Sequence, residues 1–594
     1  MKQSRTTLKE LTVAYRAVLR RGFLCNAIAL GLVAVPAMAA DTADGYVLSD
    51  GQTITLEEDV TITNTVDTEV GGRKAAVTFA GESGINTGDY MLTVNAGGAS
   101  SRNYIFNTTE DGSSFRFIGN LNGTAVSQGS VDTRGLRQNA FGSHALYDGN
   151  IDVSVQSENS NAIGVDIWYG STAIFDGALT DISSKVTGAG TYAYAIQNHS
   201  SDGSQVYLYA DQTNLSAEGG SWAEAMAVHQ GSVYLDGDAN ITARNGAIGT
   251  RGINVESDAG NPYDSIVYLK GDTVNVASES DASSALGLFS SGTPSQIISE
   301  VKNLSINAKS TASYVEGIVS QYGASVYLAS GTNTVVNAES EVGFSAGVIS
   351  QEAWAYPGHF ISHGDLTATA TGLTDGYGVF VSNDSSFLVD QLTALGKATG
   401  EGGQAIGVVI SDSVDTVIGS DGKISSIRGV AENGTGIGLL NEQDERISSV
   451  MLKGQMTIDG SSAGIVNSGT LTNLADLTVV NGMANDGIFV NNASLTISDV
   501  DAGDGCGAAI YNTGTIMSAA DASYVFENNS AACGGAIYNE GIFTFNDGVE
   551  FIGNFAQSGA AVYNDVGATL TLDGVAKFVD NVADDAVIYN AGGT

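Results

Sequence analysis

Short apolar runs recur along the chain at nearly constant spacing, and most of them begin at a small residue. A typical run begins with Gly or Ala and continues with mostly apolar residues, as in GIVS from Gly317 and GVIS from Gly347. Sixteen such anchors lie 21 to 35 residues apart. They begin at Gly164, Ala195, Ala227, Gly252, Gly287, Gly317, Gly347, Gly378, Gly407, Gly438, Gly464, Ile488, Ala509, Ala536, Ala561 and Val587. Self-similarity at such a period is typical of a solenoid.

Two further β-like runs lie between successive anchors, for example QVYL from Gln205 and NITAR from Asn240. No helical period intervenes, so βαβ units do not fit. An antiparallel sandwich would show turn signals every 8–12 residues without a longer repeat. We therefore predict an all-β, right-handed parallel β-helix with three short strands per coil of roughly 25–35 residues.

The pattern divides the chain into four parts. Residues 1–39 combine a basic start, an apolar stretch and small residues before Ala39, which predicts a secretory signal peptide cleaved after Ala39. A membrane anchor is the alternative, but the apolar stretch is short for one. We assign residues 40–150 to an N-terminal cap and first irregular coils. Residues 151–440 are coils with loop insertions, and residues 441–594 carry GGAIYN and FxxN repeats.

Charge excludes one class of partner. The chain has 24 basic and 65 acidic residues, a formal net charge of −41. Removal of the signal would take away six basic residues and one acid, so −41 − 5 gives −46. A surface this acidic repels nucleic acid, so we expect no nucleic-acid partner.

Cys506 and Cys533 occupy equivalent positions, each six residues before an Asn of its repeat (Asn512 and Asn539). Stacking of successive coils places their Cα atoms about 5 Å apart, within disulfide range. In an oxidising compartment we predict a structural disulfide, with two free thiols as the alternative.

Two further series recur at the coil period. Stacked amides can satisfy one another, so a structural ladder is predicted for the asparagines at one corner. These are Asn441, Asn467, Asn491, Asn512, Asn539, Asn564 and Asn590. The Tyr residues at 511, 538, 563 and 589 are expected to stack on the opposite side of the strand. A sugar-binding aromatic strip is the less favoured interpretation of that Tyr series.

No catalytic constellation stands out. Parallel β-helices include polysaccharide lyases and hydrolases, which need a positioned acid and base. The acidic pair Asp584/Asp585 has no basic partner close in sequence, and the pairs Asp236/Asp238 and His363/Asp365 are isolated. P-loop, dinucleotide and zinc signatures are absent from the sequence. We expect no catalytic residue, no cofactor and no metal site.

Two loops that interrupt the period concentrate aromatic residues. One contains Trp168 and Tyr169, and the other contains Trp354, Tyr356 and His359. Loops on a rigid scaffold often carry function, and aromatic side chains are favoured binding anchors. We treat these five residues as candidate binding residues. The alternative is that their rings fold back over their own coils.

The last third carries a family resemblance. GAAIYN (507–512), GGAIYN (534–539) and GAAVYN (559–564) alternate with FENN (526–529), FIGN (551–554) and FVDN (578–581). These paired tetrapeptides resemble the repeats of the chlamydial polymorphic outer-membrane proteins, within the wider class of autotransporter passengers. The resemblance implies a passenger displayed beyond the outer membrane of a Gram-negative bacterium. It also implies an outer-membrane β-barrel translocator in cis. This sequence holds no such barrel and stops directly after an anchor, so we expect it to be part of a longer reading frame.

The resulting hypothesis is an exported protein at the cell surface, or a secreted one, that acts as an adhesin. Its partner would be a surface receptor or a glycan on host cells, matrix or other bacteria. A secreted polysaccharide lyase or hydrolase and a structural surface stalk are the alternatives.

Overall fold

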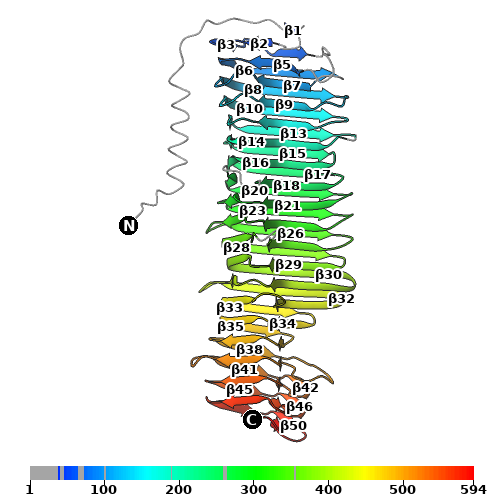
Figure 1. The fold of residues 1–594 in the computed structure, drawn as a ribbon, viewed down its shortest axis with the longest axis vertical. Helices are drawn as coiled ribbons and strands as arrows, with labels where there is room; N and C mark the ends of the chain where they lie inside the picture. Colours follow the sequence, from blue (N-terminus) through cyan, green and yellow to red (C-terminus); the bar gives the residue numbers. More distant parts are fainter. Residues whose placement is uncertain are drawn as a thin grey trace, which may run out of the picture.

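The computed structural model describes residues 38–39, 46–64, 73–98, 102–188, 190–257, 264–352 and 356–594. Throughout these ranges the chain forms strands and turns, and 48 strands join one sheet through parallel pairing. Figure 1 shows the strands stacked in chain order into a rod, from the blue N-terminal part to the red C-terminal part. The rod has about 17 turns. The predicted parallel β-helix is thereby confirmed. Among the residues that the structure describes, no helix is long and apolar enough to cross a membrane.

Each coil contributes three strands, which define three faces of the rod. In one coil they are β21 (Ser284–Ser291) on the anchor face, β22 (Ser295–Ser299) on the second face and β23 (Asn303–Ser310) on the third face. The next coil repeats them as β24 (Val315–Gln321), β25 (Ser325–Leu328) and β26 (Asn333–Ser340). Each strand pairs in parallel with its counterpart in the next coil. Parallel pairing also joins β5 (Arg73–Phe79), β7 (Arg102–Thr108) and β9 (Thr133–Gln138), so it extends through the predicted N-terminal part.

Strict alternation builds the core on the second and third faces. In β23, Leu304 and Ile306 point inward, whereas Asn303 and Lys309 point to solvent. β-Branched and aromatic residues suit these strands because they pack well on a pleated surface. One continuous hydrophobic cluster runs from Leu48 to Val562 along the axis of the rod.

The anchor strands break this alternation at their glycine. Leu288 belongs to the axial core, whereas Leu286 and Phe289 form a separate cluster outside it. Pairing with the next coil skips the glycine, because Leu286 pairs with Glu316 and Leu288 with Ile318. Two consecutive inward positions, Gly287 and Leu288, therefore bend the strand. The residues on either side of the bend point outward and converge.

We call these two converging columns the outer seam. The column before the bend residue, which is Ala225 in the first of these strands and Gly in the others, contains Glu224, Arg251, Leu286, Glu316, Ala346 and Tyr377. The column after it contains Ala227, Asn254, Phe289, Val319, Ile349 and Phe380. Ala227 was predicted to be an anchor, but the register places Ala225 at the anchor position of that coil. The columns touch, since the Tyr377 and Phe380 rings stack with centroids 6.1 Å apart. Although they point away from the core, Leu286 and Phe289 are only 4% and 7% exposed.

The asparagine ladder is present, but one predicted member is wrong. Each Asn Nδ2 donates to the next Asn Oδ1 at 2.6 to 3.4 Å through seven residues. These are Asn441, Asn467, Asn485, Asn512, Asn539, Asn564 and Asn590. Asn491 instead accepts a 2.7 Å hydrogen bond from Asn473 at another corner.

Coil length explains this correction. Only 18 residues separate the ladder positions Asn467 and Asn485. The anchor-face strand of this short coil is β36 (Met483–Asn485), which pairs with β34 (Ala463–Asn467) and β39 (Ile510–Asn512). The apolar run from Ile488, predicted to be an anchor, is β37 (Ile488–Asn491) and pairs with β35 (Thr470–Val480) on the second face.

The FxxN motifs build a further ladder. Asn529 Nδ2 donates to Asn554 Oδ1 at 3.0 Å, and Asn554 Nδ2 donates to Asn581 Oδ1 at 2.9 Å. The phenylalanines of the same motifs also stack, with Phe526–Phe551 and Phe551–Phe578 centroids 5.3 and 5.2 Å apart; the first two rings are buried and Phe578 is exposed. Each FxxN tetrapeptide therefore places one ring and one amide where the next coil repeats them.

The bend generates the first prediction. A Cβ on Gly317 would lie 2.2 Å from Val336 Cγ1 and 2.4 Å from the Gly347 carbonyl oxygen. Overpacking of this kind costs about 1–3 kcal/mol. We expect Gly317→Ala to lower the midpoint of thermal unfolding followed by circular dichroism. Gly343→Ala is the control, because nothing lies within 4 Å of that Cβ position. Equal midpoints for the two variants would contradict the steric account of the bend.

The asparagine ladder generates the second prediction. Asn512 is buried, and its amide joins Asn485 above to Asn539 below. Asn512→Ala would leave both neighbours short of a partner, at a cost of about 1–3 kcal/mol each for a buried unsatisfied group. We expect a lower denaturant midpoint than for Asn492→Ala, a half-buried asparagine in the turn after β37. A variant as stable as wild type would show that the ladder contributes no net stability.

Candidate functional site

Both predicted aromatic loops leave the rod at the same corner. Trp168 and Tyr169 follow β11 (Ala162–Ile167), and Tyr356 follows β27 (Ser345–Gln351); both strands lie on the anchor face. We call this corner, where the anchor strands end, the loop edge. The two loops are six coils apart, which is about 29 Å at one coil per 4.8 Å. They therefore share one side of the rod but do not form one pocket.

The candidate residues differ in how they are held. Trp168 is half-buried, and its Nε1 donates to Asp166 while its ring meets His199 edge-on at 4.7 Å. Tyr169 is 43% exposed and Tyr356 is 53% exposed. Trp168 thus packs on its own coils, whereas both tyrosines present exposed rings.

The remaining candidates in the second loop are placed as follows. His359 is the first residue of β28 (His359–Gly372), and its Nδ1 lies 2.9 Å from Ser386 Oγ in the next coil. Trp354 lies outside the described residues, as does most of the predicted signal peptide. At the predicted cleavage site, only the backbone of Met38–Ala39 is described, as β1.

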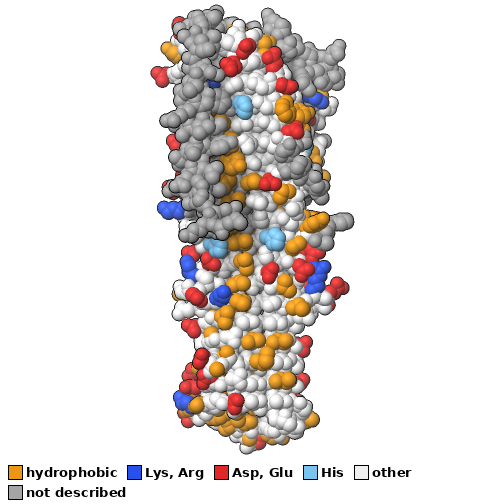
Figure 2. All heavy atoms as spheres, turned by 60° about the vertical axis from the view of Figure 1, so that its left-hand side comes forward, with side chains coloured by type: hydrophobic (Ala, Val, Ile, Leu, Met, Phe, Trp, Pro, Cys, Tyr) orange, Lys and Arg blue, Asp and Glu red, His pale blue; other side chains and the backbone are white. Residues whose placement is uncertain are grey.

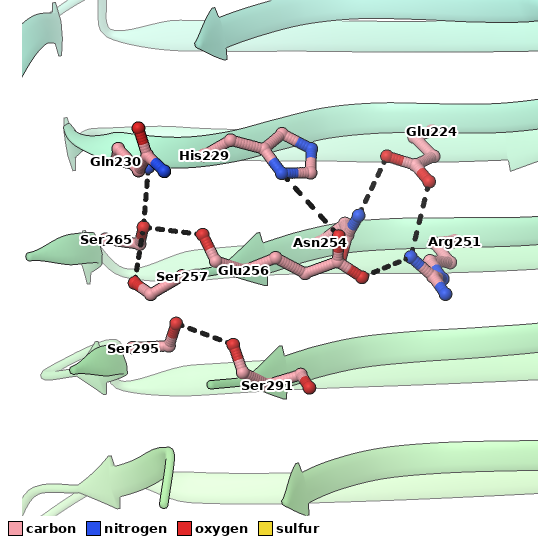
Figure 3. Close-up of polar contacts among 10 residues, drawn as sticks. All are labelled: Glu224, His229, Gln230, Arg251, Asn254, Glu256, Ser257, Ser265, Ser291 and Ser295. Atoms are coloured by element: carbon pink, nitrogen blue, oxygen red, sulfur yellow. Dashed lines mark hydrogen bonds and ion pairs between the residues drawn. The ribbon is translucent and has the colours of Figure 1, made fainter. Parts of the chain in front are cut away.

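A charged cluster that the sequence did not reveal lies on the outer seam (Figure 3). Arg251 Nη1 lies 2.8 Å from Glu256 Oε1 and 3.5 Å from Glu224 Oε1. Its guanidinium also covers the rings of Trp222 and Phe289, at 4.6 and 4.3 Å from the centroids. This combination of two carboxylates and two aromatic rings fixes the orientation of the guanidinium.

Neighbouring side chains extend the cluster. Asn254 Nδ2 donates to Glu224 Oε2 at 3.0 Å, and His229 Nδ1 lies 3.6 Å from Glu256 Oε2. Ser265 Oγ donates to the Glu256 carbonyl at 2.6 Å and anchors the chain just beyond the site. The groups come from three coils, and Figure 3 shows them converging across adjacent strands.

The two carboxylates of the cluster have different surroundings. The Glu224 side chain is 4% exposed, whereas that of Glu256 is 34% exposed. Burial raises the pKa of Glu224, although Arg251 and Asn254 oppose this shift. The nearest oxygens of the two carboxylates are at most 3.5 + 2.8 = 6.3 Å apart. Arg251 occupies the space between them, so the arrangement is an ion-pair triad.

Glu316 lies in the same column of the outer seam as Arg251, two coils further along the rod. It lies between Leu286 and Ala346 on the seam, and burial raises the pKa of its carboxyl group to about 7. Within the described part of the chain, no group of three His, Cys, Asp or Glu side chains is arranged to hold a metal ion.

The C-terminal coils contain the other two predicted features. Cys506 and Cys533 pair across adjacent coils, with Cα atoms 4.6 Å apart, and are joined by a disulfide. Tyr511, Tyr538, Tyr563 and Tyr589 form an outward stack with centroids 4.9 to 5.2 Å apart. The Tyr511 hydroxyl donates to Glu540 and the Tyr538 hydroxyl donates to Asp565. These four rings therefore stack on one another, and acidic side chains accept hydrogen bonds from the first two.

Comparison with known proteins adds no assignment: no protein-family model, curated protein or solved structure matches the chain. The fold and the geometry of its surfaces are therefore the basis for a functional proposal.

The raised pKa of Glu316 generates the third prediction. The folded value of about 7 exceeds the ordinary 4.5, so the folded form binds the proton more tightly than the unfolded chain. The resulting stability is present below pH 4.5 and is lost as pH rises to 7 and beyond. We expect Glu316→Gln to match wild type at pH 4 and to be more stable at pH 8, by about 1–3 kcal/mol.

Thermal unfolding between pH 4 and pH 8.5 checks this expectation. Glu432→Gln serves as the control because Glu432 is exposed. If the difference between Glu316→Gln and wild type does not change with pH, the seam does not raise the pKa of this carboxyl group.

Proposed function

We propose that this chain is the displayed passenger of an autotransporter and that it acts as an adhesin through the side of its β-helix. The signal-like N-terminus and the GGAI and FxxN repeats support export and surface display. An elongated scaffold suits a protein that must present binding groups away from the membrane.

One observation carries the binding part of the proposal. The loops that interrupt the coil period gather along the loop edge, where Tyr169 and Tyr356 are exposed about 29 Å apart. Separate aromatic contacts on one rigid scaffold favour multivalent attachment to an extended surface. The partner class is a receptor or glycan on host cells, matrix or other bacteria.

The second candidate function is a polysaccharide-active enzyme, and the Arg251 cluster is the observation in its favour. Glu224 and Glu256 are two carboxylates in different surroundings on the outside of the rod. A change of partner for Arg251 would be needed before they could act as acid and base on one bond. Release of reducing or unsaturated sugars that Glu256→Gln abolishes would favour this function over adhesion.

The fourth prediction tests adhesion. We expect Tyr169→Ala combined with Tyr356→Ala to reduce binding to target cells or matrix at least tenfold, because both rings lie on the loop edge. Tyr314→Ala is the matched control, since Tyr314 is 45% exposed but lies in the turn between β23 and β24. Binding is measured with purified full chain, and circular dichroism verifies folding. A folded double variant that adheres like wild type would remove these loops from the proposal.

Deletion of two whole coils separates an adhesin from a structural stalk. Thr273, Asn303 and Asn333 are equivalent positions in successive coils, so removal of residues 273–332 preserves the register. A stalk tolerates this shortening without loss of function. In an adhesin that uses both loops, the deletion shortens the distance between them, so we expect weaker binding.

A further inference from the structure

The second face of the last coils carries two outward columns without a charge. The intervening residues Leu471, Phe489, Ile516 and Phe543 belong to the axial core, so their neighbours on both sides point outward. The first column is Ser449, Thr470, Ile488, Thr515, Ile542 and Thr569. The second is Met451, Thr472, Val490, Met517, Thr544 and Thr571. We call these twelve residues the neutral face.

Both the aliphatic side chains and the hydroxyl groups of this face are accessible. Ile488, Met517 and Ile542 are 41%, 41% and 47% exposed. Within the described part of the chain, the hydroxyl groups of Thr472 and Thr515 make no hydrogen bond to another protein group. The face thus alternates aliphatic groups with hydroxyls that remain available to a partner. These two columns carry no charged residue over six coils, although the chain has a net charge of −41.

The backbone beneath these columns is regular. Pairing from β35 through β37, β40 (Thr515–Ser518) and β44 (Ile542–Phe545) to β48 (Thr569–Leu572) runs without a shift in register. The Asn485–Asn512–Asn539 ladder supports the corner before the face, and Asn473 with Asn491 supports the corner after it. Because the backbone of this surface is already rigid, the protein loses little conformational entropy when a partner binds.

The dimensions and charge of the face select the kind of partner. Six coils at about 4.8 Å by two columns about 7 Å apart cover on the order of 200 Å². A stable association of two copies needs about 800 Å² per partner, and both copies would be strongly acidic. An anionic polymer would meet the same repulsion. A neutral polymer with a regular repeat meets neither obstacle, since it can contact successive coils in the same way.

We propose that the neutral face binds an extended, neutral polysaccharide that lies along the rod. The carbon–hydrogen faces of the sugar rings pack on Ile488, Met517 and Ile542, and the sugar hydroxyls hydrogen-bond to the threonines. This proposal rests on the proposed function of the chain as a binding rod and names the ligand class for one of its faces.

Co-sedimentation of the full chain with insoluble cellulose, chitin and β-1,3-glucan tests the proposal. The test variant is Thr472→Lys with Thr544→Lys, which places a charge at two positions of the second column. The control is Thr457→Lys with Thr478→Lys, two exposed threonines paired on the third face. We expect wild type and control to sediment with at least one of these glycans. Retention of the test variant should fall at least tenfold, and soluble polygalacturonate should not compete.

Each of the following outcomes would overturn the proposal. Equal retention of test and control variants would remove the neutral face from binding, even if the chain still adheres to cells. Sedimentation with none of the neutral glycans, while cell adhesion persists, would exclude the ligand class but leave the proposed function. Loss of both activities in the wild-type chain would refute both. A dimer detected by light scattering and abolished only in the test variant would assign the face to a second copy.

Discussion

Each coil of this protein must match the backbone hydrogen-bonding pattern of the coil before it. Parallel strands are bonded only to their neighbours along the rod, so a change of register in one coil would displace side chains in the next. Equivalent positions therefore face the same environment from coil to coil. Stacked phenylalanines such as Phe526 and Phe551, the Asn512 ladder and the Cys506–Cys533 bridge all follow from this constraint. The same constraint gives the outer surfaces their columns.

The small anchor residue, Ala225 beside Glu224 and Gly252 beside Arg251, modifies this regular pattern. It allows two consecutive residues to point inward and turns two outward columns toward each other as the outer seam. Groups on the seam lose water, which explains the raised pKa of Glu224 and the need for Arg251 beside it. The second face of the last coils has no such bend, and its side chains Ile488, Met517 and Ile542 remain exposed. Figure 2 shows hydrophobic side chains recurring along the length of the rod on one side of the molecule. The rod therefore has a seam whose side chains satisfy one another and other surfaces open to partners.

The fold was predictable because its signals are local and repeated. Alternation around Leu304 and Ile306 predicts a half-buried strand, and the recurrence of Gly317 and Gly347 predicts the coil. The position of Ile488 was not predictable, because Asn485 and Asn491 both end short apolar runs. Only the unusually short coil decides which of them joins the main ladder.

The Arg251 cluster could not be found from the sequence for a different reason. Glu224, Arg251 and Glu256 come from neighbouring coils, and their sequence separations match no recognised motif. Their contact depends on the bend at Gly252 and on the register between coils. The loop edge was partly predictable from its aromatic residues, but the 29 Å between its loops required the coil count. The neutral face is invisible in sequence, since it depends on which residues of several coils point the same way.

The central claim is that the side of the rod binds, over several consecutive coils. Hydroxyl-radical footprinting with mass spectrometry, on the full chain free and bound to its target surface, tests it most directly. The account predicts protection of exposed side chains at the coil period, at Tyr169 and Tyr356 on the loop edge or at Ile488, Met517 and Ile542 on the neutral face. Protection confined to a single point around Glu256 and Arg251, with all of these residues unchanged, would contradict it.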